Sequence, residues 1–555
     1  MTHVRIGPLV RATTATEVTI WAELSQPCTV LLHVKPYNAS ECEAVTISVP
    51  TITIGGHYYV APQITNLQPA TWYTYHLYTP EQDQHTSLLQ CFRTLTSDTK
   101  QEKPLRLVYG SCRKLSHPQQ DTLAAFGKWL KEHEEERETL WPHVLLLIGD
   151  QIYADQPARK LREMYPQAHK GATSFEDFTH FYQHAWTNGE GTRQALAAIP
   201  TYMIFDDHEI TNSWNTWPTW RAEAIQQGKE QILIDGQVAY WVYQGWGNLS
   251  SQERLHHPLA QMMQRAEHSA QDILEELRDY IRTTMSEQSE QYWHYQIPTM
   301  PPIFVINTRT DRTAIFPHNQ KDLLAPTHIM GQQQMADLRR WMSENTTQPA
   351  IIASSVPVLL PPVIGLAEYL MGIRLWSKSM APLRWLGQQL ARIQLRLAQR
   401  LKFDHWPIYT ASWNELLQTV RDHSGTVVIL AGDVHFSYAA EGRPLFSRAQ
   451  KTRFYQLVSS PIQNELSFDD QRLIQGQSIV RRMIYGGLDT RILPIQATAP
   501  AIHTRNHLLF ENTLAYVTLQ PDAEGHYTMQ QEYFGLVDGR LETIGRTTLP
   551  ENGYV

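Results

Sequence analysis

Three continuous apolar runs in this chain each end at an acidic pair or at a Gly-Asp dipeptide. They are His143–Ile148 before Gly149-Asp150, Thr201–Phe205 before Asp206-Asp207, and Thr426–Ala431 before Gly432-Asp433; further runs are Leu105–Tyr109, Ile303–Ile306 and Ala350–Ala353. Apolar runs of this kind are typical of strands buried on both faces of a parallel sheet. Because helical stretches alternate with the runs, the sequence predicts a layered α/β core, with polar residues gathered at one edge of the sheet.

The first ninety-odd residues follow a different pattern. Apolar and polar residues alternate in segments separated by Pro, Asn and Gly clusters, namely Val4–Val10, Glu17–Glu23, Thr29–Val34, Ala44–Val49 and Trp72–Tyr78. This pattern predicts a small all-β sandwich of the fibronectin III or immunoglobulin type over residues 1–98, with Tyr73 or Tyr75 near a strand corner. Residues 99–555 are then predicted to form one large α/β unit with helical insertions near 215–300 and 360–415.

Charge and cysteine content exclude several classes of protein. The 47 basic and 55 acidic residues give a net charge of −8, whereas general nucleic-acid binding requires clustered Lys and Arg. The four cysteines have no Cys-x-x-Cys spacing, so neither a zinc knuckle nor a disulfide scaffold is expected, and Cys28, Cys42 and Cys91 look structural. The first residues lack a charged segment followed by an apolar one, which predicts a cytoplasmic location, or a periplasmic or secreted one for a processed form.

Residue types that can carry chemistry follow the predicted strands. Five segments hold them: Gly110-Ser-Cys112, Gly149-Asp150-Gln-Ile-Tyr153-Ala-Asp155, Asp206-Asp207-His208-Glu209-Ile-Thr-Asn212, Asn307-Thr-Arg309-Thr-Asp-Arg312 and Gly432-Asp433-Val-His435. Carboxylates, an imidazole, an amide, a thiol and a phenol at neighbouring strand ends can bind one or two cations, and one carboxylate can bridge two metals.

Each segment also has a structural explanation when it is taken alone. A Gly-Asp dipeptide often forms a turn or a helix cap, and a single Cys or Tyr is often a core residue. The run Asp206–Glu209 is different, because four adjacent ionisable residues after an apolar strand require counter-ions. The sequence therefore indicates a functional site there.

Taken in order, these segments resemble the PhoD-like alkaline phosphatase and phosphodiesterase family of the calcineurin-like metallophosphoesterase superfamily. Supporting stretches are Ile329-Met-Gly331 with Gln334, Trp406 with Tyr409, and Leu457–Pro461. The resemblance implies a layered α/β/β/α sandwich core preceded by the small β sandwich. It also implies metal-dependent hydrolysis of phosphodiesters or phosphomonoesters by a metal-activated hydroxide at a dinuclear or multinuclear centre.

The same resemblance implies a mixed centre of iron (Fe3+) and calcium (Ca2+). In that centre Asp150 is the bridging, catalytic carboxylate, and His208 is the catalytic group that contacts the phosphate or the leaving oxygen. The implied iron ligands are Cys112, Tyr153 and His435, and the groups that face calcium are Asp207, Asn212 and Asp433. Thiolate and phenolate suit a ferric ion, and carboxylate and amide oxygens suit calcium.

The chain also departs from the family pattern. Asn307 stands where an Asp is common, Pro407-Ile408 replaces Asp-Gly, and Ser354-Ser355 follow a strand where classical metallophosphoesterases place a metal-binding His. The last departure argues against an iron–zinc centre. Arg309 and Arg312 are candidates for binding the substrate phosphate, with a structural salt bridge as the alternative.

Two further possibilities concern partners. Residues 383–402 are amphipathic and basic, which fits either a peripheral membrane helix or a helix that caps the core. A small-molecule phosphate ester or a lipid is therefore a possible substrate, and a phospholipid phosphodiesterase at a membrane surface is an alternative function. A third reading is a non-catalytic binding protein with a decayed metal site.

Overall fold

The computed structural model describes most of the chain. The described residues are 2–37, 40, 44–80, 88–97, 103–269, 271–287, 289–312, 327–346, 348–375, 380–445, 452–499, 502, 504, 506–522 and 527–549. Cys42 and the predicted boundary between residues 98 and 99 lie outside them. The division into two domains stays a prediction.

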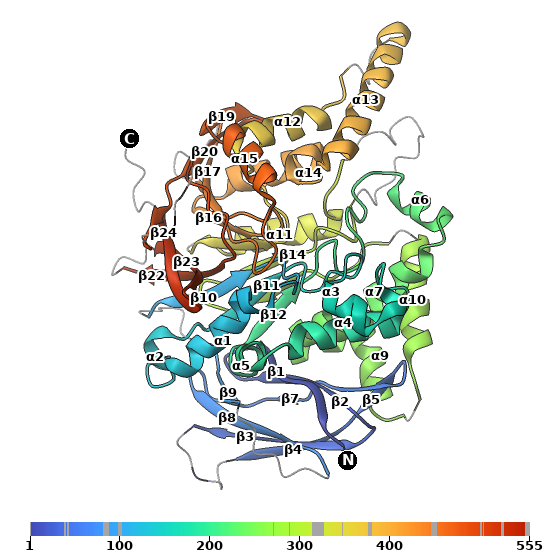
Figure 1. Ribbon diagram of the computed structural model, residues 1–555, viewed down its shortest axis with the longest axis vertical. Helices are drawn as coiled ribbons and strands as arrows, with labels where there is room; N and C mark the ends of the chain where they lie inside the picture. Colours follow the sequence, from blue (N-terminus) through green and yellow to red (C-terminus); the bar gives the residue numbers. More distant parts are fainter. Residues whose placement is uncertain are drawn as a thin grey trace.

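The N-terminal region is all β and forms two sheets, which lie at the foot of the molecule in Figure 1. One sheet has the order β1-β2-β6-β5, with β7 also paired to β2, and the other has the order β4-β3-β8-β9. The strands are β1 (Val4–Thr13), β2 (Val18–Leu24), β3 (Thr29–Pro36), β4 (Val45–Pro50), β5 (Ile52–Ile54), β6 (His57–Val60), β7 (Gln63–Ile64), β8 (Trp72–Tyr78) and β9 (Cys91–Arg93). The Tyr73 hydroxyl accepts a hydrogen bond from the Gln68 backbone N–H at 2.7 Å, as expected for a tyrosine at a strand corner.

A seven-stranded mixed sheet carries the first of the buried apolar runs. Its order is β12 (Thr201–Ile204), β11 (Val144–Ile148), β10 (Leu105–Gly110), β22 (Leu514–Pro521), β23 (Tyr527–Val537), β24 (Arg540–Leu549) and β21 (Gln496–Ala497). Strands β10, β11 and β12 are parallel, and β22 joins β10 in antiparallel fashion. The carboxyl ends of three predicted strands therefore meet at one edge.

An eight-stranded mixed sheet carries the remaining runs. Its order is β13 (Tyr295–Ile297), β14 (Ile303–Ile306), β15 (Ala350–Ser354), β16 (Thr426–Ala431), β18 (Arg453–Val458), β17 (Tyr438–Pro444), β20 (Leu488–Leu493) and β19 (Arg482–Tyr485). Strands β14, β15, β16 and β18 are parallel. The two large sheets and the helices outside them form the predicted layered α/β/β/α core (Figure 1).

Helices flank the sheets and fill the predicted insertions. The first group is α1 (Thr122–Glu132), α2 (Arg137–Leu140), α3 (Arg159–Met164), α4 (Phe175–Thr187) and α5 (Glu190–Ala198). The insertion near 215–300 holds α6 (Trp220–Gln226), α7 (Glu230–Tyr240), a π-helix (Trp241–Gly245), α8 (Ser251–His256), α9 (Pro258–Ala266) and α10 (Leu274–Glu287). The later group is α11 (Gln332–Glu344), α12 (Pro362–Gly372), α13 (Ala381–Leu401), α14 (Thr410–Asp422) and α15 (Phe468–Gln477).

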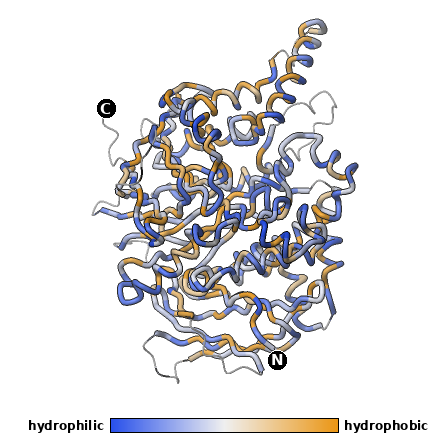
Figure 2. The backbone as a smooth tube through the Cα atoms, viewed as in Figure 1, coloured by the Kyte–Doolittle hydropathy of each residue, from blue (hydrophilic) through white to orange (hydrophobic). Residues whose placement is uncertain are grey.

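Hydropathy follows this layering, because the large sheets are mostly hydrophobic and many outer loops are hydrophilic (Figure 2). One continuous core joins the N-terminal sheets to the seven-stranded sheet; its buried members include Trp21, Tyr59, Trp186 and Tyr243. Among the described helices, none combines the length and apolar character needed to cross a membrane.

Candidate metal centre

The ends of four parallel strands bring most of the predicted ligands together. Cys112 follows β10, Asp150 follows β11, Asp207 follows β12, and Asp433 follows β16. Four groups of side chains have their ligand atoms within 4.8 Å of one another: Cys112 with Asp150 and His435, Asp150 with Asp207 and His208, Asp206 with Asp207 and Asp433, and Asp404 with His405 and Asp433. Because these groups share members, they form one connected cluster between the two large sheets.

The backbone at this edge adopts unusual conformations. The φ angles are positive at Cys112 (58°), Asp150 (55°), Asp433 (69°) and His435 (60°). Side-chain-bearing residues rarely adopt the left-handed region, and such strain persists where surrounding structure enforces it and clusters at functional sites. Gly149 has φ 108°, and a Cβ there would lie 2.6 Å from the Cβ of Asp206, so neighbouring strand ends can approach only because this residue is glycine.

Asp150 lies at the centre of the cluster. Its Oδ2 is 3.5 Å from Cys112 Sγ and 3.3 Å from the Tyr153 hydroxyl. Its Oδ1 accepts a hydrogen bond from the His208 backbone N–H at 3.1 Å. A carboxylate with neighbours on both sides is placed as a bridging ligand would be.

On one side of Asp150 lie the residues expected to bind iron. The Tyr153 hydroxyl is 3.4 Å from His435 Nε2. Asn464, which the sequence analysis missed, donates to the Tyr153 hydroxyl at 2.8 Å and lies 3.4 Å from His435 Nε2. Asn464 lies in the loop after β18, beyond the Leu457–Pro461 stretch, and belongs to no recognised motif, so only the fold reveals it.

On the other side lie the groups expected to face calcium. Asp207 and Asp433 belong to one of the four groups. Asn212 is less directly placed: its side-chain oxygen accepts a hydrogen bond from Ser213 Oγ at 2.9 Å, and its backbone N–H donates to Asp155 Oδ2 at 2.8 Å. Asn212 thus lies beside the cluster, with its side chain engaged by its own neighbour.

His208 is held by two contacts. Its Nδ1 lies 2.6 Å from Asp155 Oδ1, and its ring stacks on Tyr153 with ring centres 4.3 Å apart. Burial alone would lower the pKa of His208, but Asp207, Asp150 and Asp155 outweigh it and raise the pKa to about 10. The imidazole therefore prefers its charged form among these carboxylates.

Three members of the cluster carry groups whose anionic forms are disfavoured by the protein alone. Burial, reinforced by neighbouring negative charges, raises the pKa values of Asp150, Cys112 and Tyr153 well above their ordinary values. Burial lowers the pKa of His435 to about 4, which favours the neutral ring that binds metals. This set of buried thiol, phenol, imidazole and carboxylates fits cations, which would supply the missing positive charge.

The two predicted phosphate-binding arginines are buried among carboxylates. Arg309 donates through Nε to Asp206 and lies 3.1 Å from Asp404 Oδ2 through Nη1, while its buried Nη2 has no hydrogen-bond partner among the described residues. Arg312 donates to the Thr308 carbonyl and lies 3.3 Å from Asp404. Both arginines therefore have structural partners, and the Nη2 of Arg309 lies 3.9 Å from Asp207 Oδ1.

Other residues that the sequence analysis did not single out support the cluster. His405 Nε2 is 3.2 Å from Asp433 Oδ2, and its Nδ1 is 2.7 Å from Glu368 of α12. Buried Arg113, directly after Cys112, pairs with Asp121 at 2.6 Å, and Asp121 also caps α1. Neither His405 nor Asp121 belongs to a strand-end motif, which is why the sequence analysis did not single them out.

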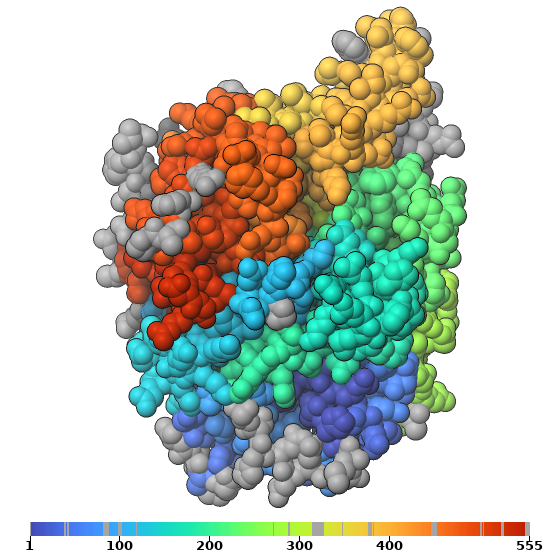
Figure 3. All heavy atoms as spheres, viewed as in Figure 1, coloured from blue at the N-terminus to red at the C-terminus, as the bar shows by residue number. Residues whose placement is uncertain are grey.

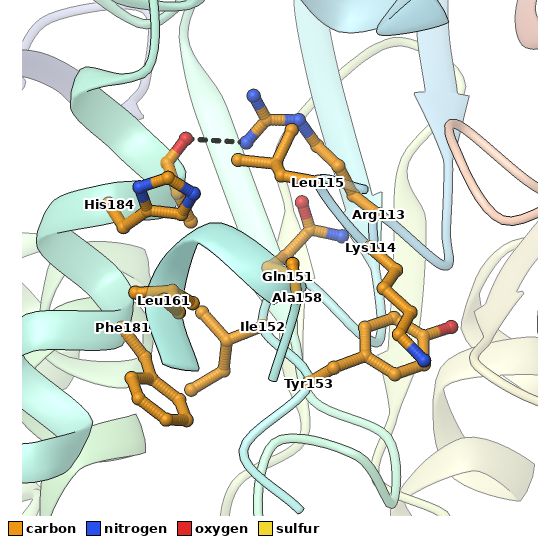
Figure 4. Close-up of a pocket in the computed structure, with 11 residues that line it drawn as sticks. Arg113, Lys114, Leu115, Gln151, Ile152, Tyr153, Ala158, Leu161, Phe181 and His184 are labelled. Atoms are coloured by element: carbon orange, nitrogen blue, oxygen red, sulfur yellow. Dashed lines mark hydrogen bonds between the residues drawn. The ribbon is translucent and has the colours of Figure 1, made fainter. Parts of the chain in front are cut away.

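A small pocket adjoins Tyr153 (Figure 4). Its empty volume is about 280 Å³, counting the space that opens to solvent. Lys114 lies over the Tyr153 ring at 5.4 Å, and two buried polar atoms on the lining, Gln151 Oε1 and His184 Nε2, have no hydrogen-bond partner among the described residues. Such atoms are suited to bound water.

Comparisons with known proteins identify the family of this chain. The PhoD-like phosphatase family model matches residues 107–488, and a domain family of unknown function, DUF7800, matches residues 1–87. No curated protein matches the chain.

The solved structures that resemble this chain include one that covers nearly all of it. The alignment with the structure of PhoD covers 98% of this chain and 88% of the PhoD chain, with a TM-score of 0.58 and 13% sequence identity. This likeness shows the fold. The alignment with the sensor domain of the anti-sigma factor RsgI4 of Pseudobacteroides cellulosolvens covers 19% of this chain and 98% of that domain, with 21% sequence identity and a TM-score of 0.15. That second match carries no argument.

Proposed function

The chain belongs to the PhoD-like phosphatase family, and on that premise we propose that it hydrolyses phosphodiesters or phosphomonoesters at the cluster around Asp150. Membership supports phosphoester hydrolysis in general. The observation that carries the assignment to this cluster is the sharing of Asp150 between two of the ligand groups. A shared carboxylate is what two adjacent cations require.

The donor set fits the two metals that the family resemblance implies. Cys112, Tyr153, His435 and Asp150 would hold Fe3+, and Asp150, Asp207 and Asp433, with Asn212 beside them, would hold Ca2+. When bound, the cations would lower the pKa of a water molecule and offset charge on the phosphoryl oxygens.

His208 is the group best placed to handle the proton of the leaving oxygen. Because Asp155 occupies Nδ1 at 2.6 Å, Nε2 is the nitrogen left to act on the substrate. Asp155 is a positioning residue: it holds the ring orientation and also binds the Asn212 backbone N–H. Arg309, with its spare Nη2, can add one donor toward a phosphate oxygen.

Elemental analysis paired with activity tests this proposal. We expect purified protein to contain iron, to absorb visible light because ferric thiolate and phenolate bonds do so, and to cleave bis- or mono-p-nitrophenyl phosphate faster with added calcium. A colourless, iron-free protein that is fully active would remove the iron assignment. Tight metal binding without turnover of either ester would favour a non-catalytic binding protein instead.

Three variants locate the activity. Asp150→Asn should lose metal and at least about 100-fold in kcat/KM, since the bridging ligand is lost. Cys112→Ser should change the visible spectrum whether or not activity survives. The matched control is Asp422→Asn on the exposed end of α14, which should keep metal, spectrum and activity. Full activity in Asp150→Asn would place the site elsewhere.

A further inference from the structure

Helix α13 packs on the protein through small residues. Gly387, Ala391, Gln394 and Ala398 are its buried positions, and their spacing of four, three and four residues puts them on one face. Gln394 Nε2 donates to the Leu370 carbonyl of α12 at 2.8 Å, which ties the helix to its neighbour. The face turned toward the protein is therefore narrow and made largely of Gly and Ala.

The large apolar side chains of α13 are exposed. Leu386 is 50% exposed, Ile393 60%, Leu397 40% and Leu401 50%, and half-buried Leu390 completes their stripe at helical spacing. An amphipathic helix of a globular protein normally turns such a stripe toward the core. Here the described chain leaves it uncovered.

A basic row runs beside the apolar stripe. Arg392, Arg396 and Arg400 are exposed and lie at helical spacing, Arg384 and Lys402 extend the positive charge, and residues 381–402 contain no Asp or Glu. Trp385 is 59% exposed at the amino-terminal end of the helix. A basic row, an apolar stripe and an exposed Trp are together typical of helices that lie in a membrane interface.

The position of α13 suits contact with a flat surface. The helix projects beyond the body of the molecule at one end (Figure 1), and the outer part of the helix forms a protrusion in the space-filling view (Figure 3). Most of the large exposed apolar residues of the described chain lie in α12, α13, α15 or β19, or directly beside them, namely Leu370, Leu375, Met380, Leu383, Trp385, Leu386, Ile393, Leu397, Leu401, Phe468, Leu473, Ile479, Val480 and Ile484. A soluble surface rarely gathers so much apolar area without a partner.

We infer that the outward face of α13 docks on an anionic lipid surface. Charge complementarity selects this partner, because the arginine row needs negative groups at the depth where the Leu and Ile side chains enter apolar material. A second copy meeting the same face would place two arginine rows together, which is unfavourable. The inference does not depend on the proposed hydrolase activity.

Vesicle flotation tests the inference with three proteins. The first protein is the full chain, and the second is the arginine variant Arg392→Gln/Arg396→Gln/Arg400→Gln. The third is a matched control, Arg159→Gln/Arg265→Gln/Arg340→Gln, which removes three exposed arginines elsewhere. Each protein is mixed with phosphatidylcholine vesicles with and without 30% phosphatidylglycerol. We expect the full chain and control to float only with the anionic vesicles, and the first variant to bind about 100-fold more weakly, at roughly fivefold per basic residue. Added salt should reduce binding of the full chain.

The remaining outcomes are equally decisive. Leu386→Ser/Ile393→Ser/Leu397→Ser should also lose flotation while keeping the thermal midpoint of the full chain. Absence of flotation, or equal flotation of the arginine variant and the control, would overturn the inference. If sedimentation shows that the full chain is a dimer and that the Leu386→Ser/Ile393→Ser/Leu397→Ser variant is a monomer, a second copy covers this face and the inference is overturned. Whether vesicle phospholipid is also hydrolysed is a separate measurement that leaves the docking result unchanged.

Discussion

At the scale of single residues, Glu209 organises the candidate metal centre without belonging to any of the four ligand groups. Its carboxylate accepts backbone N–H bonds from Asp150 at 2.9 Å, Gln151 at 2.7 Å and Asp206 at 2.8 Å. Gln244 of the π-helix adds a further donor at 3.1 Å. One buried side chain therefore joins the loops after β11 and β12 and holds Asp150 in its strained conformation.

The variant Glu209→Gln tests this role. An amide keeps the size but replaces one acceptor oxygen with a donor, so at least one buried N–H loses its partner, which costs about 1–3 kcal/mol. We expect lower stability in urea unfolding and reduced metal content by elemental analysis. Glu132→Gln, on the exposed end of α1, should stay within about 0.5 kcal/mol of the parent. Unchanged stability and metal content in Glu209→Gln would refute the role.

At the scale of elements, a charged contact joins the N-terminal sheet to α4. His57 of β6 lies 3.0 Å from Glu23 of β2 through Nδ1 and 2.7 Å from Glu176 of α4 through Nε2, and Arg5 of β1 lies 3.4 Å from Glu23. Burial alone would lower the pKa of His57, but the hydrogen bonds to the two glutamates outweigh it and raise the pKa above 6.5. The charged imidazole thus stabilises the contact between strand and helix.

This contact should weaken as pH rises. The pKa of His57 is higher in the folded protein than in the unfolded protein, where it is about 6.5. The stabilisation that charged His57 provides is therefore complete below pH 6.5 and is lost as the pH rises through the folded-state pKa. We expect the thermal midpoint of the parent to exceed that of His57→Gln at pH 6 and the difference to shrink at alkaline pH. A difference that is constant with pH would show that the effect is packing alone.

At the scale of the whole molecule, the N-terminal sandwich shares its core with the rest of the chain. Buried Arg11 donates to the carbonyls of Thr201, Tyr243 and Gln244 and to Asn248 Oδ1, all at 2.9 Å or less. The indole of Trp21 donates to the Val242 carbonyl at 3.0 Å. The N-terminal sandwich therefore contacts and supports the π-helix, whose Gln244 donates a hydrogen bond to Glu209.

Removal of residues 1–98 should unfold or aggregate the remainder. The truncation would expose the apolar surface around the π-helix. It would also remove Arg11, so the backbone carbonyls that accept hydrogen bonds from Arg11 would lose their donor. We expect the full chain to unfold in one calorimetric transition and the shortened chain to be insoluble or to melt far lower. A soluble remainder that melts within a few degrees of the full chain would show that the sandwich is energetically independent.

Much of the fold follows from the sequence alone. Every predicted apolar run is a strand, because a segment that is apolar on both faces is buried only when other layers cover both faces of its sheet. The acidic residues that follow these runs therefore lie at the strand ends. The same reasoning placed Cys112, Asp150, Asp207 and Asp433 at strand ends, but the predicted single edge is built from two sheets, because Asp433 follows a strand of the eight-stranded sheet.

Only the tertiary structure decided how that edge is supported and which surfaces remain open. Glu209, Asn464 and His405 act through contacts between elements far apart in sequence, and no local pattern encodes such contacts. The amphipathic pattern of α13 was visible beforehand, but it fits a core helix as well as a surface one. Its small residues turned out to be the buried ones, because the side of a helix that meets the protein is set by its neighbours rather than by its own sequence.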